Sequence, residues 1–373
     1  MHHKLFIVIT VTKNRGVVLS SISHDTAAKK TVITDGLASS IWVISDGTPG
    51  MRLQAIALGQ ALHATENPTA KLEDIILTPP WLLRHIPRLA KALPLTWLRA
   101  MIEPALPRRL HQFLTFTIVI TCGRRMAGLS IAMQRLGKED ANNSNWVKRI
   151  RTIHIQNPRL SPSHFDVLIV PQHDQVRGPN VVTSMASLNR LNNVNIKEAA
   201  RTLESKWSKL PAPRVAVLLG GNNRRYNISI TMVHEMAERL KKFAATTGTS
   251  LALIPSKRTP GELLNHLTQA LEQIPHAIAD PKDKNPYPGI LGIVEAIIVT
   301  SDSVNLTSEA TITGKPVLIA KWRQETGRIG SFHDAMMGAG HTMPLDNSLP
   351  IRAFTPLDEM PNILSQVIGL LSR

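Results

Sequence analysis

Short runs of β-branched and aliphatic residues alternate with amphipathic stretches along most of the chain. Strands are expected at residues 41–44, 117–120, 152–155, 167–170, 215–219, 251–254, 296–299 and 316–319. Helices are expected at residues 54–62, 127–136, 196–209, 230–243 and 357–371. Continuous apolar strands separated by helices are typical of parallel sheets that are covered on both faces. The pattern therefore predicts an α/β fold.

The length of 373 residues suggests two domains, because a domain usually has roughly 100 to 200 residues. Pro211 and Pro213 interrupt a helical pattern just before a new strand, so we expect the boundary there. The expected parts are an N-terminal extension of unknown order at residues 1–40, an N-terminal domain at 41–210, a C-terminal domain at 211–350 and a final helical segment at 351–373. Two such sheets side by side leave a cleft between them.

Lysine and arginine outnumber aspartate and glutamate by 43 to 27, and the resulting net charge of +16 is expected to attract phosphate-bearing partners. Specific nucleic-acid binding is not expected, because only 4% of the residues are aromatic and no zinc-finger spacing occurs. The single cysteine, Cys122, can form neither an intramolecular disulfide nor a zinc cage of cysteines. No apolar run reaches 18 residues. These features predict a cytoplasmic protein with no metal site and no membrane-spanning segment, and they leave the oligomeric state open.

Two loops of the first half follow strands and contain glycine. In open parallel sheets, ligands bind outside the carboxyl ends of the strands. The candidate residues are Gly47, Gly50 and Gln54 from the first loop and its helix, and Gly123, Arg124 and Arg125 from the second. Each loop is interpreted either as an anion site at a helix N-terminus or as a tight turn.

Three strand ends of the second half carry glycine, hydroxyl and basic residues. The candidate residues are Gly220, Gly221, Ser256, Arg258, Thr259, Ser301, Asp302 and Ser303. Backbone N–H groups, hydroxyls and cations suit phosphate oxygens, so we expect these loops to converge on one pyrophosphate group. Glu309 follows on the first turns of a helix, where a carboxylate suits a ribose diol. The alternative is a capped helix with a solvent-facing glutamate.

Several motifs together carry a resemblance to a known family. They include Trp42, Asp46-Gly47, Gly123-Arg124-Arg125, Gln156-Asn157-Pro158-Arg159, Pro171, His173-Asp174, Gly178-Pro179-Asn180-Val181, Gly220-Gly221, Asn285-Pro286-Tyr287, Thr300, Asp302-Ser303-Val304 and Ser308-Glu309. In this order, over about residues 41–360, the chain resembles the elongated-mitochondria fission-protein family, whose members occur in plants and in bacteria. The resemblance implies a fold similar to the GT-B glycosyltransferases, with two Rossmann-like parallel-sheet domains that face a cleft. By the same analogy, the final helix is expected to cross back to the N-terminal domain.

These loops and the resemblance lead to a functional hypothesis. A nucleotide-sugar, expected to be UDP-linked, is the substrate and lies against the C-terminal domain; the glycine loops of the first half belong to the acceptor side, and no cofactor is expected. Asp46 is the first candidate for the general base and His173 the second, although His173 can equally be a loop histidine bonded to its own turn. The chain lacks the Tyr-x-x-x-Lys pair and glycine-rich loop of short-chain sugar-nucleotide epimerases, which excludes that class. The competing hypothesis is a non-catalytic interaction protein that keeps the same fold.

Residues 79–111 interleave two tryptophans, Trp81 and Trp97, and many leucines with arginine and lysine. Tryptophans beside cations over an apolar face are typical of interfacial segments, so an anionic membrane surface is a second expected partner. The protein would then lie peripherally on the inner face of the bacterial membrane. Prolines break any long helix in this segment, and the alternative is a set of short helices packed on the first domain.

Overall fold

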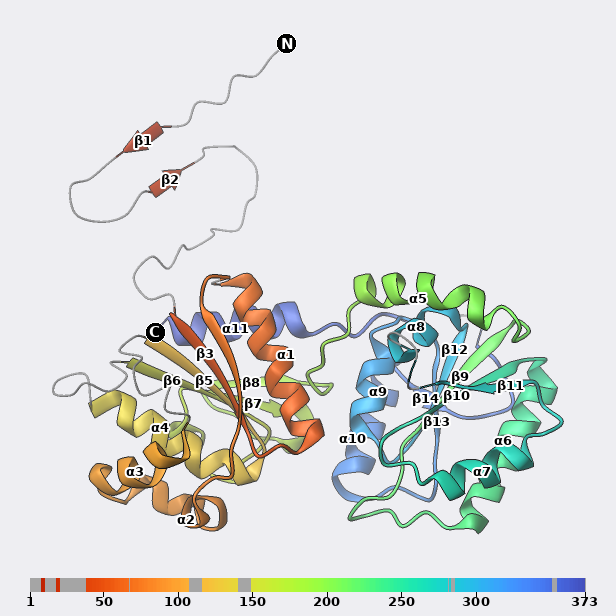
Figure 1. The fold of residues 1–373 in the computed structure, drawn as a ribbon, viewed down its shortest axis with the longest axis horizontal. Helices are drawn as coiled ribbons and strands as arrows, with labels where there is room; N and C mark the ends of the chain where they lie inside the picture. The colour runs from red at the N-terminus through yellow and green to blue at the C-terminus, as the bar shows by residue number, and fades with distance from the viewer. Residues whose placement is uncertain are drawn as a thin grey trace.

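The computed structural model describes residues 8–10, 18–20, 38–66, 68–106, 116–139, 149–280, 282, 286–350 and 354–372. Two α/β domains lie side by side, and each is built on a parallel sheet of six strands (Figure 1). The expected α/β fold with two parallel-sheet domains is therefore confirmed. Ahead of the domains, β1 (Val8–Thr10) and β2 (Val18–Ser20) pair antiparallel. The other residues of the expected extension up to residue 37 lie outside the described residues.

The N-terminal sheet has the strand order β4-β3-β5-β6-β7-β8. Its strands are β3 (Ser40–Ser45), β4 (Lys71–Ile76), β5 (Phe116–Cys122), β6 (Arg149–Ile155), β7 (Val167–Pro171) and β8 (Val181–Ser184). One face packs against α1 (Pro49–Thr65) and α11 (Met360–Leu371). The other face packs against α2 (Trp81–His85), η1 (Pro87–Lys91), α3 (Leu95–Ile102) and α4 (Ala127–Glu139). Because helices cover both faces, the middle residues of central strands such as β3, β5 and β7 are apolar and buried.

The C-terminal sheet has the strand order β11-β10-β9-β12-β13-β14. Its strands are β9 (Arg214–Leu219), β10 (Ser250–Pro255), β11 (His276–Ile278), β12 (Ala296–Thr300), β13 (Val317–Ala320) and β14 (Met343–Pro344). Helices α6 (Ile230–Thr247) and α7 (Gly261–Ala270) cover one face. Helices α5 (Asn193–Trp207), α8 (Pro286–Ile293) and α9 (Val304–Thr311) cover the other. Helix α10 (Gly327–Gly338) follows β13 and lies on the side of the N-terminal domain (Figure 1).

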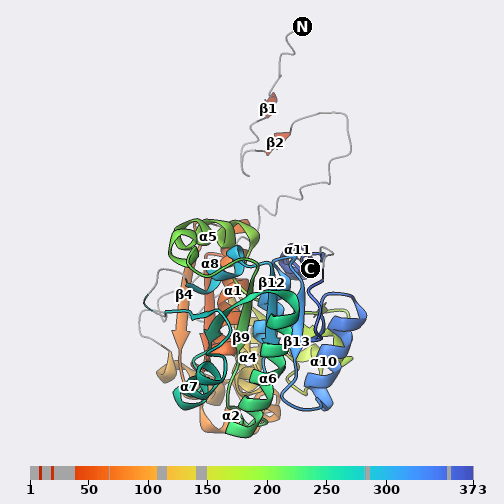
Figure 2. The same cartoon turned by 90° about the vertical axis from the view of Figure 1, so that its right-hand side faces the viewer.

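The chain passes between the domains at two places. Helix α5 lies over α8 in both views of the ribbon (Figures 1 and 2), and its Leu203 and Trp207 are part of the C-terminal core, although α5 precedes the prolines that suggested a boundary. Helix α11 returns to the N-terminal domain, where Ile363 and Val367 are buried. The Glu359 carboxylate fixes the start of α11, because it accepts hydrogen bonds from backbone N–H groups of the loop after β8 at 2.8 to 3.0 Å.

Most of the segment 79–111 forms short helices that pack on the N-terminal core. Leu83, Leu98 and Ile102 are fully buried there. Trp81 and Trp97 point outward and keep 68% and 63% of their surface exposed. Residues 107–111 lie outside the described residues. Among the helices that the structure describes, none is both long and apolar enough to cross a membrane.

Candidate functional site in the interdomain cleft

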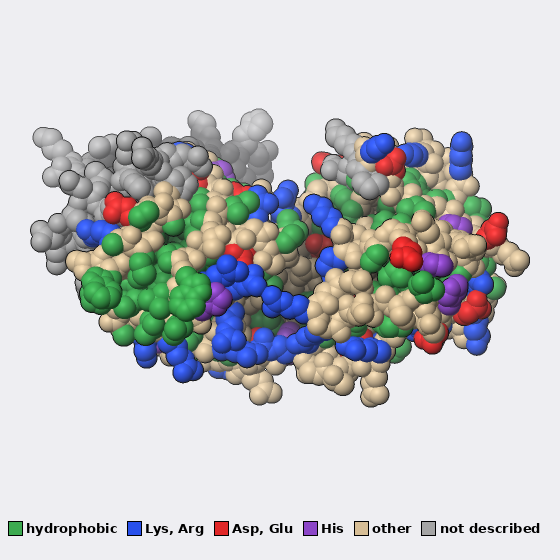
Figure 3. Space-filling model, turned by 60° about the horizontal axis from the view of Figure 1, so that its bottom comes forward, with side chains coloured by type: hydrophobic (Ala, Val, Ile, Leu, Met, Phe, Trp, Pro, Cys, Tyr) green, Lys and Arg blue, Asp and Glu red, His purple; other side chains and the backbone are tan. Residues whose placement is uncertain are grey.

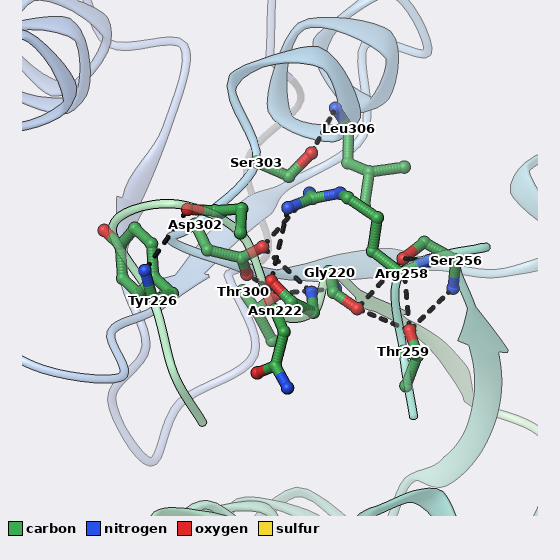
Figure 4. Close-up of polar contacts among 12 residues, drawn as sticks. Gly220, Asn222, Tyr226, Ser256, Arg258, Thr259, Thr300, Asp302, Ser303 and Leu306 are labelled. Atoms are coloured by element: carbon green, nitrogen blue, oxygen red, sulfur yellow. Dashed lines mark hydrogen bonds and ion pairs between the residues drawn. The ribbon is translucent and has the colours of Figure 1, made fainter. Parts of the chain in front are cut away.

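The loops at the strand ends of the C-terminal sheet meet around one buried carboxylate, that of Asp302, which follows β12 (Figure 4). Its side chain has 0% exposure. Oδ2 accepts from the Gly221 N–H at 2.9 Å and from Nη2 of Arg258 at 3.1 Å. Oδ1 accepts from Oγ1 of Thr300 at 2.8 Å and from Nε1 of Trp322 at 3.0 Å. Four donors from the ends of β9, β10, β12 and β13 therefore neutralise this charge and hold the loops together.

The two glycines after β9, Gly220 and Gly221, leave room for Asp302 and for the loop after β10 to pack against the backbone. A Cβ at Gly220 would lie 2.1 Å from Oδ2 of Asp302, and one at Gly221 would lie 2.0 Å from the Arg258 carbonyl oxygen. The Gly220 N–H donates to Oγ1 of Thr300 at 2.8 Å, and the Gly221 N–H is occupied by Asp302. The two glycines thus permit close backbone packing, and their N–H groups are used inside the protein and not left for a phosphate.

The loop after β10 is tied to the same glycines. Ser256 Oγ donates to the Gly220 carbonyl oxygen at 2.9 Å, and Thr259 Oγ1 donates to the same oxygen and to that of Leu219 at 3.0 Å. Arg258 also donates from Nη1 to the Gly221 carbonyl oxygen at 3.2 Å. The expected convergence of Gly220, Ser256 and Arg258 in space is observed. The hydroxyls, however, are bound to the backbone, and only Arg258 extends toward open space.

A cavity of about 360 Å³ lies between the two domains beside this cluster. Its basic lining residues are Arg225, Arg258 and Arg328 from the C-terminal domain and His173 from the N-terminal domain. The other lining residues include Met51, Gln54, Gln156, Asp174, Ser184, Asp302, Ser303, Asn305 and Phe332. Figure 3 shows Lys and Arg side chains crowded where the two domains meet. The cavity is therefore a cationic hollow that needs both domains to close it.

The start of α9 faces this cavity. Ser303 is the N-cap residue, and its Oγ accepts from the Leu306 N–H at 3.4 Å. Val304 and Asn305, the first two residues of the helix, also line the cavity. An N-terminal helix end offers unpaired N–H groups and a positive partial charge, both of which attract an anion. Ser303 thus lines the cavity and caps the helix end that faces it.

Glu309 lies two turns further along α9, beside a second hollow of about 360 Å³. Its Oε2 accepts from the Tyr287 hydroxyl at 2.7 Å. Burial raises the pKa of the Glu309 carboxyl, while the hydrogen bond from Tyr287 opposes the rise. Gln54, Ser187 and Asn305 line both hollows, so the two hollows adjoin. The sequence alternative of a solvent-facing glutamate does not hold, because this carboxylate is partly buried and bonded to a tyrosine. Asn285, the start of the Asn-Pro-Tyr motif, lies outside the described residues.

The two candidate general bases have different surroundings. His173 lines the interdomain cavity, where partial burial lowers its pKa; neighbouring Asp174 opposes this effect and Arg328 adds to it. Asp46 lies at the end of β3, accepts from the Thr48 N–H at 3.1 Å and pairs with Arg125 at 3.4 Å. Burial acts to raise the pKa of Asp46, but the hydrogen bonds from Thr48 and Arg125 outweigh it and hold the pKa below its usual value.

The remaining acceptor-side candidates divide into two groups. Gln54 lines both hollows, and Gly50 approaches the other domain so closely that a Cβ would lie 2.7 Å from Nδ2 of Asn305. Gly47 and Gly123 have φ angles of 79° and 87°, so each needs the left-handed backbone of a turn. Arg124 and Arg125 are exposed, and neither is among the residues that line either hollow.

Ser301 belongs to a separate network behind the cavity. Its Oγ donates to Glu325, which also accepts from the Tyr226 hydroxyl, and its carbonyl oxygen is 2.9 Å from Nε2 of the buried His333. Burial and the Glu325 carboxylate raise the pKa of Tyr226. These contacts anchor α10 to the loop after β12. Ser301 is therefore a structural residue in this arrangement and does not reach the cavity.

Sequence reasoning missed Arg328, which is on α10 and pairs through Nε with Oδ1 of Asp174 at 3.3 Å. Thr326 and Gly327 precede this arginine, but five residues separate them from the end of β13, so the pattern of glycine and hydroxyl residues directly after a strand does not mark it. Its role depends on the N-terminal domain, which supplies the partner carboxylate. No group of three or more His, Cys, Asp or Glu side chains in the described ranges is arranged to hold a metal ion.

Two parallel-sheet α/β domains that close a polar cleft at their strand ends define the GT-B class of fold. The family model described as mitochondrial fission ELM1 matches residues 49–371. The chain belongs to this family. Mitochondrial fission protein ELM1 of Arabidopsis thaliana is 27% identical over 267 residues, which cover 65% of this chain and 58% of the plant protein. An uncharacterized protein of Rickettsia prowazekii, RP120, is 26% identical over 313 residues, covering 75% of this chain and 82% of that protein. The match thus spans less than two thirds of the plant relative.

Solved structures show the same fold. The UDP-GlcNAc 2-epimerase of Methanocaldococcus jannaschii in complex with UDP-GlcNAc and UDP has a TM-score of 0.51 at 11% identity and covers 89% of this chain and 99% of its own. The UDP-GlcNAc 2-epimerase of Neisseria meningitidis bound to UDP-GlcNAc has a TM-score of 0.50 at 12% identity, with coverages of 89% and 91%. At this level of identity the likeness establishes the GT-B fold and leaves the reaction open.

Proposed function

We propose that this protein binds a nucleotide diphosphate-sugar, UDP-linked, in the interdomain cleft and transfers the sugar to an acceptor held by the N-terminal domain. The observation that carries the proposal is the concentration of Arg225, Arg258 and Arg328 around one cavity at the N-terminus of α9. Solved structures of the same fold hold UDP-GlcNAc, which supports this substrate class. Separate residues would bind the diphosphate and the ribose and deprotonate the acceptor.

The diphosphate would lie at the start of α9. Free N–H groups of the first helical turn and the three arginines provide donors and positive charge for its oxygens. Transfer leaves a nucleoside diphosphate whose bridging oxygen gains negative charge in the transition state. Preorganised cations stabilise that charge more than they stabilise the bound substrate, which lowers the barrier. Asp302 takes part indirectly, because it fixes the Arg258 guanidinium at 3.1 Å.

The ribose would occupy the hollow beside Glu309. A carboxylate accepts hydrogen bonds from two neighbouring hydroxyls at once, and Tyr287 holds the Glu309 carboxylate in place at 2.7 Å. Asn305 lies between this hollow and the diphosphate cavity and lines both. The spacing of six residues between Ser303 and Glu309 therefore separates a phosphate position from a ribose position along one helix.

His173 is the better candidate for the general base. It lines the cavity, and its lowered pKa leaves the imidazole neutral at pH 7, so that it can accept the proton of an acceptor hydroxyl. Asp46 pairs with Arg125, and its lowered pKa makes it a weak base. The acceptor would reach His173 from the side of Gln54 and Met51.

Calorimetry with UDP and with 2′-deoxy-UDP tests this assignment. The wild type is expected to bind UDP more tightly than the deoxy compound, and Glu309→Gln is expected to show a smaller difference between the two, because the amide NH2 replaces one of the two oxygens that accept from the diol. Lys209→Gln, an exposed change away from the cleft, serves as the control. Absence of heat with any nucleotide, in protein shown to be folded, would overturn the proposal. Product analysis with a bound UDP-sugar then separates transfer, epimerisation and a non-catalytic protein that keeps the nucleotide site.

A membrane-associated acceptor is the second part of the proposal. Trp81 and Trp97 are largely exposed on helices that flank the cationic η1 segment. Figure 3 shows hydrophobic side chains next to Lys and Arg on the N-terminal domain, the combination that favours an anionic bilayer surface. The double variant Trp81→Ala/Trp97→Ala is expected to weaken co-sedimentation with anionic liposomes. Unchanged sedimentation would remove the membrane from the proposal.

A further inference from the structure

A second cationic hollow, which we call the basic pocket, lies in the N-terminal domain and has a volume of about 560 Å³. Its basic lining residues are Arg88, Lys91, Arg159 and Arg177, together with His164. The others are neutral: Ile131, Asn157, Leu160, Ser161, Pro162 and Val176. Within the described ranges, the lining contains no carboxylate. Four arginines and lysines therefore gather around one small hollow without a counter-charge in its wall.

Three separate segments bring these cations together. Arg88 and Lys91 are on η1, which packs on α4. Arg159 follows β6, and Arg177 lies between η7 (Gln172–Asp174) and β8. Arg177 is held by hydrogen bonds from its guanidinium to the carbonyl oxygens of Val176 at 2.8 Å and of Gln172 at 3.3 Å. Since no single element supplies the charge, the cluster is a product of the tertiary fold.

Arg159 is held in an unfavourable backbone conformation at this pocket. Its φ angle is 58°, a left-handed value at which a glycine or an asparagine is usual. The Asn157 side chain stabilises this turn by accepting from the Arg159 N–H at 2.8 Å. The Gln-Asn-Pro-Arg motif thus has an arginine at a position where a glycine would adopt the left-handed backbone at a lower conformational free energy. Gln156 of the same motif lines the interdomain cavity, so one loop joins the basic pocket to the cleft.

The electrostatics of the pocket disfavour its unliganded state. Burial lowers the pKa of His164, and the charge of Lys91 lowers it further. Like charges gathered without counter-charges repel one another, and a bound anion removes this repulsion. Arginine forks match tetrahedral oxyanions, and neutral His164 and Ser161 add hydrogen-bonding groups. No aromatic ring other than that imidazole lines the pocket among the described residues, so nothing in it is suited to stack a nucleobase.

We propose that the basic pocket binds the phosphate group of a phosphate monoester or diphosphate, as a second anion site distinct from the interdomain cavity. The ligand reaches the pocket from the surface of the N-terminal domain, where Arg88, Lys91, Arg159 and Arg177 are exposed. Its charge is matched by Arg88, Lys91 and Arg159. The site does not depend on a nucleotide in the cleft, since none of its lining residues belongs to the C-terminal domain.

The pocket can be tested through His164, which reports on this site alone. NMR titration of the histidine rings, with His164 assigned from His164→Gln, is carried out with and without inorganic pyrophosphate. Pyrophosphate is expected to raise the pKa of His164, because it neutralises the cations that disfavour the imidazolium. The double variant Lys91→Gln/Arg159→Gln is expected to lose this response, while Lys197→Gln/Lys209→Gln, an exposed pair on and after α5, keeps it. UDP affinity, measured in parallel, is expected to be equal in all three proteins, so failure of the cleft site and failure of this site are distinguishable.

Flotation with vesicles separates the two sources of phosphate. Vesicles of phosphatidylcholine with and without phosphatidic acid are mixed with the wild type and both double variants. If the Lys91/Arg159 pair alone weakens binding to phosphatidic acid vesicles, the phosphate belongs to a lipid headgroup. If pyrophosphate shifts His164 but all proteins bind vesicles alike, the ligand is soluble. The proposal is overturned if His164 does not respond and vesicle binding is indifferent to the pair.

Discussion

Arg328 of α10 and Asp174 of η7 (Gln172–Asp174) form an ion pair that crosses the cleft, with Nε and Oδ1 3.3 Å apart. The Asp174 side chain is only 6% exposed, whereas that of Arg328 is 46% exposed. Both residues line the interdomain cavity. The arginine that a diphosphate would need is therefore paired with a carboxylate of the other domain in the free protein, and a ligand must compete for it.

This competition gives the first prediction. Arg328→Gln is expected to weaken UDP binding about tenfold, because a charge-assisted hydrogen bond to a phosphate is lost. Asp174→Asn is expected to strengthen binding by about threefold, because the competing carboxylate is removed while the shape is kept. Calorimetry with UDP measures both, with Lys209→Gln as the charge-matched control for the arginine. Equal affinities for all four proteins would show that the diphosphate does not reach Arg328.

Asp302 is expected to be essential for the fold of the C-terminal strand ends. Asp302→Ala leaves the N–H of Gly221 and Nε1 of Trp322 without their acceptor in a buried environment, so the free energy of unfolding is expected to fall by about 3 kcal/mol. Denaturant unfolding measures the change. Asp346→Ala, which removes an exposed carboxylate bonded to Ser348 at 2.9 Å, should have an effect below about 0.5 kcal/mol. If Asp302→Ala lowers the free energy of unfolding only slightly, other contacts hold the loops together.

The close packing at Gly221 gives a steric prediction. Gly221→Ala places a methyl group 2.0 Å from the Arg258 carbonyl oxygen, so the backbone must shift, at a cost of about 1 to 3 kcal/mol in unfolding free energy. The matched control is Gly261→Ala at the start of α7, where nothing lies within 4 Å and stability should be unchanged or slightly higher. Thermal or urea unfolding compares the two. If both variants are equally stable, this loop is looser than the contacts indicate.

His154 makes stability depend on pH. Burial between the sheet and Phe165 lowers the pKa of its imidazole from 6.5 to about 3. Between these two values the unfolded chain binds the proton and the folded protein does not, so the free energy of unfolding rises with pH across this window, by up to about 1.4 kcal/mol per pH unit. The contribution is complete above pH 6.5. Urea unfolding at several pH values gives the free energy of unfolding as a function of pH. Between about pH 3 and 6.5 this free energy is expected to rise less steeply with pH in His154→Leu than in the wild type. An equally steep rise in both proteins would assign the effect to other groups.

The central strands could be predicted because the feature that defines them, a continuous apolar run, lies within a few neighbouring residues. Residues 41–44, 215–219 and 296–299 are continuous apolar runs, as a strand with helices on both faces must be, and they became β3, β9 and β12. Within the two six-stranded sheets, the four strands that the pattern missed are the edges: β4, β8, β11 and β14. An edge strand has one paired side only and is short or partly exposed, as the mixed surface of Lys71–Ile76 shows. Its pattern therefore resembles that of a loop.

The candidate site likewise has features that neighbouring residues determine and features that depend on tertiary contacts. By itself the sequence determined the α/β class, the strand ends that carry glycine, hydroxyl and basic residues, and the helix that bears Ser303 and Glu309. Only the tertiary structure decided that the amides of Gly220 and Gly221 bind inside the protein, that Arg328 faces Asp174 across the cleft, and that cations from three segments form the basic pocket. The reason is physical: propensity and periodicity act between residues a few positions apart, whereas these contacts join residues that are brought together only when whole domains pack.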